Sequence, residues 1–206
     1  FWFDEGDNLN HHKCMLSILE IQRAIKELND SDVTMKEDPL KVRMGLNSGD
    51  VILCDIGAAK ARVDLTMIGD AVNIAARLET ACSHYFIDNL VSDSVAKDAR
   101  GQFSIRIVDR IKVYGKETPV GVYEIINEVE NTSQEENDLI KHFEKGFEAY
   151  TKGKFSAGLK HFQKSKPLEI DRGYASTPSD VYISRCKMLE KSSPDNWDGT
   201  WTLESK

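Results

Sequence analysis

The chain has 206 residues and a formal net charge of −7. A chain of this length can bury one substantial hydrophobic core and a smaller appended unit. Its 40% apolar and 30% charged residues are ordinary for a folded protein. The acidic balance argues against nucleic acid or an anionic membrane surface as a partner, although it leaves room for a local basic site that binds phosphate.

Four cysteines are scattered singly along the sequence: Cys14, Cys54, Cys82 and Cys186. Without a C-x-x-C pair they predict reduced, mostly buried thiols rather than a disulfide framework or a zinc site. The sequence contains no apolar run near the roughly 18 residues of a membrane span and no leader segment, so we expect a cytoplasmic location. Its start at Phe1 instead of Met predicts that the sequence was cut from a longer one.

The first 56 residues predict one helix and two strands. Apolar residues recur at spacings of three and four over residues 9–28, which favours an amphipathic helix with Asn8 as its cap. Residues 41–47 alternate between apolar and polar side chains, as a strand does. A turn at residues 47–50 then leads into a second strand at residues 51–56.

A charged loop at residues 59–64 precedes a helix that Asp70 is expected to cap and that runs to about Cys82. A short strand at residues 90–91 and a short helix near residues 93–99 follow.

Two longer alternating segments come next, residues 103–113 and 120–126. The Gly115-Lys116 turn between them predicts an antiparallel hairpin. Strands interleaved with helices make the fold class α+β.

The composition changes after residue 127, and we therefore divide the chain into a domain at 1–127, an acidic linker at 128–138 and a helical part at 139–206. The helical part predicts three helices, and its small and aromatic residues resemble a single tetratricopeptide-type hairpin. One such unit cannot cover its own apolar face, so we expect it to dock on the first domain or on a second copy, with Trp197 and Trp201 taking part.

The stretch "MIGDAVNIAARLE" places two polar side chains on one side of a helix. Asn73 and Arg77 are four residues apart, or about 40° around the helix axis. A guanidinium suits phosphate oxygens, and an amide can hold a neighbouring hydroxyl or ether oxygen. From the pair alone, the favoured interpretation is a surface arginine beside an asparagine with local hydrogen bonds.

A longer pattern surrounds this pair. The segments "VRMGLNSGDVILCDIGAAKARVDLTMIGDAVNIAARLE" and "VYGKETPVGVYEI" resemble the class III nucleotidyl cyclase catalytic domain, of the bacterial or soluble adenylyl cyclase type. The resemblance covers about residues 1–126, the last two-thirds of such a domain. It implies a ferredoxin-like fold, truncated at its N-terminus, that cyclises a nucleoside triphosphate at sites shared between two head-to-tail protomers.

The resemblance implies roles for four residues. Asn73 would orient the ribose, and Arg77 would stabilise charge on the α-phosphate during attack by the 3′-oxygen. Thr66 falls at the purine-selecting position and points to ATP, although a plain β-branched strand or loop residue is the alternative. Arg43 matches an arginine that holds the terminal phosphates; the alternative is an outward-facing strand residue.

Two departures from the family pattern concern the triphosphate and the metal. Tyr114 stands where many members have a lysine that binds the triphosphate tail, with Lys112 or Lys116 as possible substitutes. The chemistry requires two Mg²⁺ or Mn²⁺ ions held by two aspartates. In the family both aspartates lie upstream of the strand that Phe1 to Phe3 would end, so we expect no metal ligand in this chain.

The first functional hypothesis is therefore an adenylate cyclase that is homodimeric in its catalytic part, this chain being a fragment with little activity of its own. The second is a degenerate cyclase-like module that binds nucleotide or dimerises, with a regulatory helical tail. A tetratricopeptide-like adaptor with an incidental α/β domain is a third, for which a single visible repeat is weak support.

Overall fold

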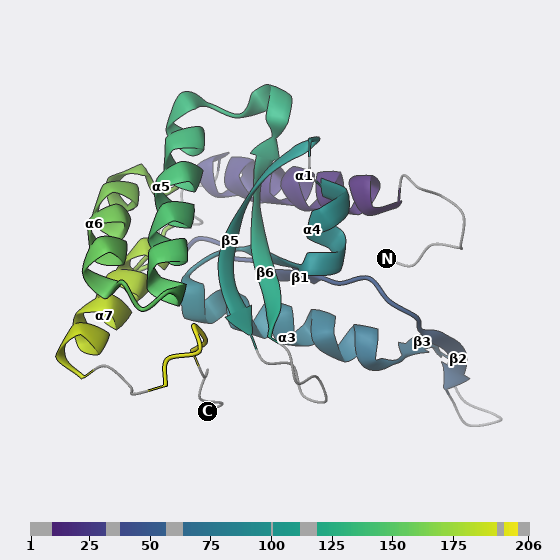
Figure 1. Ribbon diagram of the computed structural model, residues 1–206. Helices are drawn as coiled ribbons and strands as arrows, with labels where there is room; N and C mark the ends of the chain where they lie inside the picture. Colours follow the sequence, from purple (N-terminus) through teal and green to yellow (C-terminus); the bar gives the residue numbers. More distant parts are fainter. Residues whose placement is uncertain are drawn as a thin grey trace.

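The computed structural model describes residues 10–31, 38–56, 64–99, 101–111, 119–192 and 196–201. Within these stretches a four-stranded sheet has helices on both faces, and a separate two-stranded sheet lies away from it (Figure 1). The α+β fold class is thus confirmed.

The central sheet has the strand order β1-β4-β6-β5. Its strands are β1 (Met44–Leu46), β4 (Asn89–Ser92), β5 (Phe103–Ile111) and β6 (Val120–Glu128). β1 runs parallel to β4, whereas β6 is antiparallel to both β4 and β5. The predicted hairpin and the predicted short strand are therefore present. The strand predicted at residues 41–47 is shorter than expected, because its first three residues form no ladder with β4.

Helices α1 (Asn10–Ser31) and α4 (Asp93–Ala99) cover one face of this sheet. Met15, Ile18 and Leu19 of α1 are buried against Val95 of α4 and against Val91, Phe103 and Ile125 of the sheet. The stripe predicted from the spacing of apolar residues is the face that packs. The proposed cap, Asn8, lies outside the described residues.

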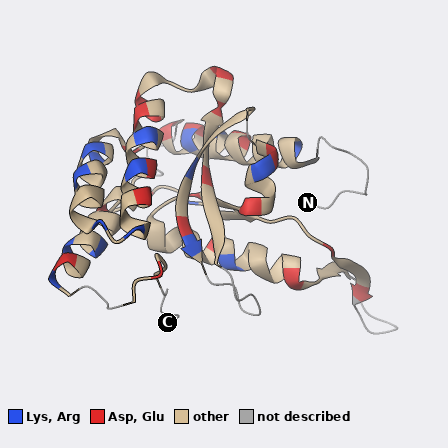
Figure 2. Cartoon of the chain, in the orientation of Figure 1, with Lys and Arg blue, Asp and Glu red and all other residues tan. Residues whose placement is uncertain are grey.

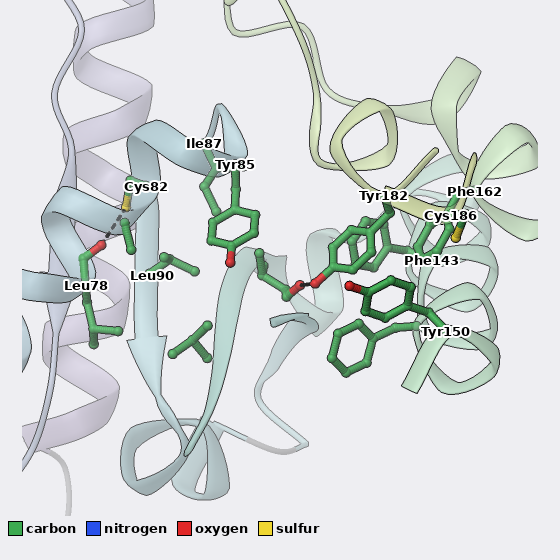
Figure 3. Close-up of a cluster of buried hydrophobic side chains, with 14 of the residues drawn as sticks. Leu78, Cys82, Tyr85, Ile87, Leu90, Phe143, Tyr150, Phe162, Tyr182 and Cys186 are labelled. Atoms are coloured by element: carbon green, nitrogen blue, oxygen red, sulfur yellow. Dashed lines mark hydrogen bonds between the residues drawn. The ribbon is translucent and has the colours of Figure 1, made fainter. Parts of the chain in front are cut away.

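Helix α3 (Asp70–Tyr85) and the C-terminal helices cover the opposite face. Leu78, Cys82 and Tyr85 of α3 belong to the same buried cluster as Phe143 and Tyr182 of the C-terminal part (Figure 3). The helical part therefore docks on the sheet within its own chain, one of the two arrangements that the sequence predicts.

The C-terminal part contains α5 (Gln134–Thr151), α6 (Phe155–Ser165) and α7 (Pro178–Lys191). α5 begins inside the predicted linker, five residues before the predicted start at Leu139. The reason is a capping box: the Ser133 hydroxyl accepts from the Glu136 amide at 3.1 Å, and the Glu136 carboxylate accepts from the Ser133 amide at 2.7 Å. Acidic composition had been interpreted as a linker, although Ser-x-x-Glu is a signal for a helix start.

Both tryptophans near the C-terminus pack on this core. The Trp197 indole donates to the Tyr150 carbonyl oxygen at 3.0 Å, and its ring lies 5.1 Å from the Tyr150 ring. Trp201 lies beneath the Arg185 guanidinium, 4.9 Å from ring centroid to carbon. Both contacts are made within the helical part, and both rings also pack against the buried cluster that this part shares with α3.

The second sheet consists of β2 (Ile52–Ile56) and β3 (Asp64–Ile68), paired antiparallel. It lies at the opposite end of the molecule from α5–α7 (Figure 1). β3 was not predicted, because the charges at 59–64 were interpreted as a loop that ran through Asp64. Residues 47–50 connect two different sheets instead of closing a hairpin between neighbouring strands.

All four cysteines are free thiols, and Cys54 is the one among them that is not fully buried. In the described part of the chain, no helix has the length and apolar character needed to cross a bilayer.

Candidate active site

The start of α3 determines where Asn73 and Arg77 lie. Gly69, not Asp70, is the N-cap residue, and its carbonyl oxygen accepts from the amides of Val72 at 3.2 Å and Asn73 at 3.4 Å. Asp70 is instead the first helical residue, where a negative charge interacts favourably with the helix dipole. The prediction that Asp70 caps the helix was therefore wrong by one position.

The "GLNSG" motif holds α3 against the sheet. A Cβ atom on Gly45 would stand 2.1 Å from the Ala75 carbonyl oxygen, so only glycine allows β1 to lie this close to the helix. Two residues further on, the Asn47 amide donates to the Ala71 carbonyl oxygen at 3.1 Å. The motif thus fixes the first two turns of α3 in relation to β1.

Asn73 and Arg77 lie one turn apart on the outward face of α3, where both are exposed. Leu78, Cys82 and Tyr85 on the other side of the helix are buried. Because residues four apart on a helix are neighbours on its surface, the amide and the guanidinium can reach one ligand that approaches from solvent. The helix geometry is therefore compatible with the predicted pairing of the Asn73 and Arg77 side chains, on a face of α3 that a ligand or another chain can approach.

Arg43 lies just before β1 and is tied to α3. Its Nε donates to Glu79 Oε1 at 2.9 Å, and both side chains are about two-fifths exposed. Glu79 is two residues beyond Arg77, which is about 200° around the helix axis, so the pair brings Arg43 to the same helix as the predicted catalytic residues but to a different side of it. An exposed pair of this kind is weak, and a polyphosphate could displace Glu79 from Arg43.

Thr66 is placed apart from the other three. It lies in β3 opposite Cys54 of β2 and is half-buried. β3 runs directly into α3 through Gly69, so Thr66 is connected to Asn73 by one short segment. The structure therefore places Asn73, Arg77 and Arg43 on or against α3, and Thr66 on the adjoining hairpin.

Two hollows in the described surface do not include any of these four residues. One, of about 480 Å³, lies beside the start of α3 and is lined partly by Asp50, Asp70 and Asp93. Its carboxylates would repel a triphosphate. The other, of about 760 Å³, lies between α1 and residues 170–173. Neither is assigned as the nucleotide site.

No three histidine, cysteine, aspartate or glutamate side chains gather closely enough to hold a metal ion within the described stretches. The described residues therefore do not fit a two-metal centre, and we assign no step to an ion held by them. Tyr114 and its possible substitutes Lys112 and Lys116 lie outside the described residues.

Sequence reasoning missed three contributors to this site. Gly45 and Asn47 were quoted within a motif but received no role, and Glu79 was not considered as a partner of Arg43. An inference from spacing could not find them, because their roles depend on β1 crossing α3. For β3, a signal was present: the alternation in "DLTMI" is typical of a strand.

The arrangement is that of an α+β domain with an amide and a guanidinium paired on an exposed helix, as suits a phosphate-bearing ligand. The chain belongs to the adenylate and guanylate cyclase catalytic domain family, whose sequence profile matches residues 5–127.

Relatives of this chain include named adenylate cyclases. That of Anabaena cylindrica is 33% identical over 131 residues, which are 60% of this chain and 25% of that protein. The terminal-differentiation-specific adenylate cyclase of Dictyostelium discoideum is 30% identical over 148 residues, 69% of this chain and 7% of that protein. The chain thus spans a quarter or less of the length of these relatives.

A similar fold is found in the crystal structure of the adenylyl cyclase CyaB from P. aeruginosa. The TM-score is 0.51 at 24% sequence identity, over 63% of this chain and 65% of that one. This likeness concerns the fold.

Proposed function

We propose that this chain forms part of an adenylyl cyclase, which converts ATP to 3′,5′-cyclic AMP and pyrophosphate. The observation that carries the proposal is the exposed pair Asn73 and Arg77 on α3, within a chain that belongs to the cyclase catalytic domain family. The two relatives described above are both named adenylate cyclases, which favours ATP over GTP.

Each proposed role follows from side-chain chemistry. A guanidinium is always charged and offers donors in a fixed fork, so Arg77 would stabilise the negative charge that grows on the α-phosphate as the 3′-oxygen attacks. The Asn73 amide would hold the ribose in line for that attack. Arg43 would leave Glu79 and contact the terminal phosphates. Two Mg²⁺ or Mn²⁺ ions remain part of the proposal, with ligands outside the described residues.

Selection of adenine is assigned to Thr66. Its hydroxyl can both donate and accept a hydrogen bond, as recognition of an adenine edge requires. The position on β3, seven residues before Asn73 and just before α3, supports a place for the base next to the ribose.

The proposal includes a second copy of the chain. The β2–β3 hairpin exposes large apolar side chains on both of its faces: Ile52 (70% exposed) and Ile68 (52%) pair on one face, and Leu65 (54%) lies on the other. Most of the described hairpin is also uncharged (Figure 2). A two-stranded hairpin is marginally stable by itself, and apolar patches of this kind mark interaction surfaces. A second protomer would cover the hairpin and complete the site that faces Asn73 and Arg77.

The deciding experiment is a turnover assay of the longest natural form of the protein with ATP or GTP, each with Mn²⁺. We expect cyclic AMP to form and ATP to be preferred. Replacing Thr66 by Cys is expected to reduce that preference, while Thr80→Ala on the outward face of α3 leaves it unchanged. If a folded sample forms no cyclic nucleotide from either substrate, the proposal is wrong.

The alternative is a cyclase-like module that binds nucleotide or dimerises without turnover. One observation favours a module that dimerises: Arg43, proposed for the terminal phosphates, already pairs with Glu79, and this pairing would weaken triphosphate binding. Binding of ATP without cyclic AMP formation in the assay above would support this alternative.

Cys54 provides a native probe of the proposed dimer. It lies in β2 and is half-buried, whereas burial raises the pKa of the Cys82 and Cys186 thiols to about 12. Because the thiolate is the reactive form, we expect alkylating reagents to label Cys54 first in dilute protein. As concentration rises and dimers form, labelling of Cys54 should slow. Peptide mass spectrometry together with sedimentation measures this, and a dimer that labels at the monomer rate would place the interface elsewhere.

A further inference from the structure

The last residue of α3 and the turn after it, residues 85–88, are held by the helical part at three of their four positions. α3 ends at Tyr85, and Phe86 adopts a left-handed conformation with φ of 59° before Asp88 leads into β4. Such a conformation is unfavourable for a bulky residue and persists only where its surroundings fix it. Tyr85, Phe86 and Asp88 each contact a side chain from residues 172–185, as described below.

Asp88 receives two of these contacts. The Tyr174 hydroxyl donates to Asp88 Oδ1 at 2.8 Å, and Arg172 Nε lies 3.3 Å from Asp88 Oδ2. The Tyr174 ring also meets the Phe86 ring edge to face, 6.4 Å between centroids. The turn is thus fixed by a hydrogen bond, an ion pair and a ring contact, all from the segment between α6 and α7.

Tyr85 is held from α7. Its hydroxyl donates to Asp109 Oδ2 at 2.5 Å, and Arg185 Nη1 donates to the same oxygen at 2.8 Å. Arg185 is only 7% exposed and lies over the rings of Tyr85, Tyr182 and Trp201. Tyr85 on α3 and Tyr182 on α7 direct their hydroxyls into the space between the two sets of helices (Figure 3).

A series of buried ion pairs connects the segment between α6 and α7 to the sheet. Arg106 Nε donates to Glu124 Oε2 at 2.6 Å, and Arg106 Nη1 donates to Glu169 Oε1 at 3.0 Å. Arg172 donates to the other oxygen of Glu124. Acidic and basic side chains therefore alternate in the order Glu169, Arg106, Glu124, Arg172 and Asp88. Charges buried in this way are costly to separate, so the segment cannot shift without disturbing the turn after α3.

We propose that Arg172, Tyr174 and Arg185 are positioning residues for α3, which set where Asn73 and Arg77 stand. The helical part is then a fixed element of the catalytic domain. The contacts above are the evidence that these residues hold α3 in place. Their effect on turnover rests on the proposed function.

Hydrogen exchange of the full chain, followed by mass spectrometry, tests the proposal independently of catalysis. Tyr174→Phe removes one hydrogen bond and keeps the ring, and Arg172→Gln removes the ion pairs with Asp88 and Glu124. Because hydrogen bonds to charged groups are among the stronger ones, we expect amides of α3 and residues 86–88 to exchange about tenfold faster or more. Amides of α1 and α4, on the other face of the sheet, should keep their rates, and Arg172→Lys should restore part of the protection.

Lys166→Gln is the matched control, because it removes an ion pair of Lys166 with Asp180 at 2.6 Å, both of which belong to the helical part. It should leave exchange in α3 unchanged. An increase confined to residues 166–180, or one that is equal over the whole chain, would overturn the proposal. If Arg172→Gln does not fold, the exchange rates of Tyr174→Phe test the proposal. If the protein is an active enzyme, the same variants should lower kcat more than they raise KM for ATP. If it is inactive, the hydrogen-exchange result still tests whether these residues hold α3.

Discussion

Replacing Arg77 by Ala is expected to lower cyclic AMP formation by about 10²- to 10³-fold, because one preorganised group that stabilises transition-state charge is typically worth that much. Arg77 is exposed on α3, away from the buried cluster. Interactions of an exposed side chain are worth about 1 kcal/mol or less, so thermal unfolding should shift only slightly and the loss should appear in kcat. The measurement is turnover with ATP and Mn²⁺ beside a melting curve of the same sample.

Two further variants sharpen that experiment. Arg77→Lys keeps a positive charge but loses the planar fork, so it should recover only part of the activity. Thr80→Ala changes a neighbour on the outward face of α3, whose hydroxyl bonds to the Ala76 carbonyl oxygen, and should retain activity. Full activity of Arg77→Ala would remove Arg77 from the mechanism.

Asp109→Asn is expected to have the largest effect on stability. Asp109 is fully buried and neutralises Arg185, so the substitution leaves a buried cation without its countercharge. Removing one partner of a buried ion pair costs about 3–5 kcal/mol. Unfolding in denaturant should show this loss, with a midpoint well below that of the unmodified protein.

A double variant distinguishes the effect of the unpaired charge on stability from the effect of lost packing. Replacing Arg185 by Met in the Asp109→Asn background removes the unpaired charge, and stability should partly recover. Lys166→Gln removes the ion pair between Lys166 (53% exposed) and Asp180 (26% exposed). This change should lower the free energy of unfolding by less than about 1 kcal/mol. If Asp109→Asn proves as mild as this control, the buried pair does not stabilise the docked helices.

These charges explain why the matched family segment and the helical part form one structure. The family profile ends at residue 127. Yet Arg106, Asp109 and Glu124, all before that residue, have partners at Glu169, Arg185 and Arg172. The first two-thirds of the chain therefore buries charges that the last third neutralises. A chain ended at residue 127 should not keep the α3 geometry described here.

Most local elements, and the residues proposed for the candidate site, could be predicted from neighbouring residues alone. Periodicity is a property of neighbouring residues, so the helix at α1, the β5–β6 hairpin and the three C-terminal helices followed from spacing. The placement of Asn73 beside Arg77 followed from the helical repeat alone. Local signals were missed at the capping residue Ser133 and in the alternation of β3, and at α3 the preference of Asp for the N-cap placed the helix start one residue too late.

Tertiary structure decided everything that depends on residues far apart in the chain. Burial of Arg106 and Asp109 could not be read from spacing, because a charged residue is stable inside only when its partner arrives from another element. The same is true of Gly45, whose missing side chain matters because β1 crosses α3 at that point, and of Tyr174, which reaches back to Asp88. Local preference assigns a residue to a helix or a strand, whereas the packing of those elements against one another decides which side chains meet.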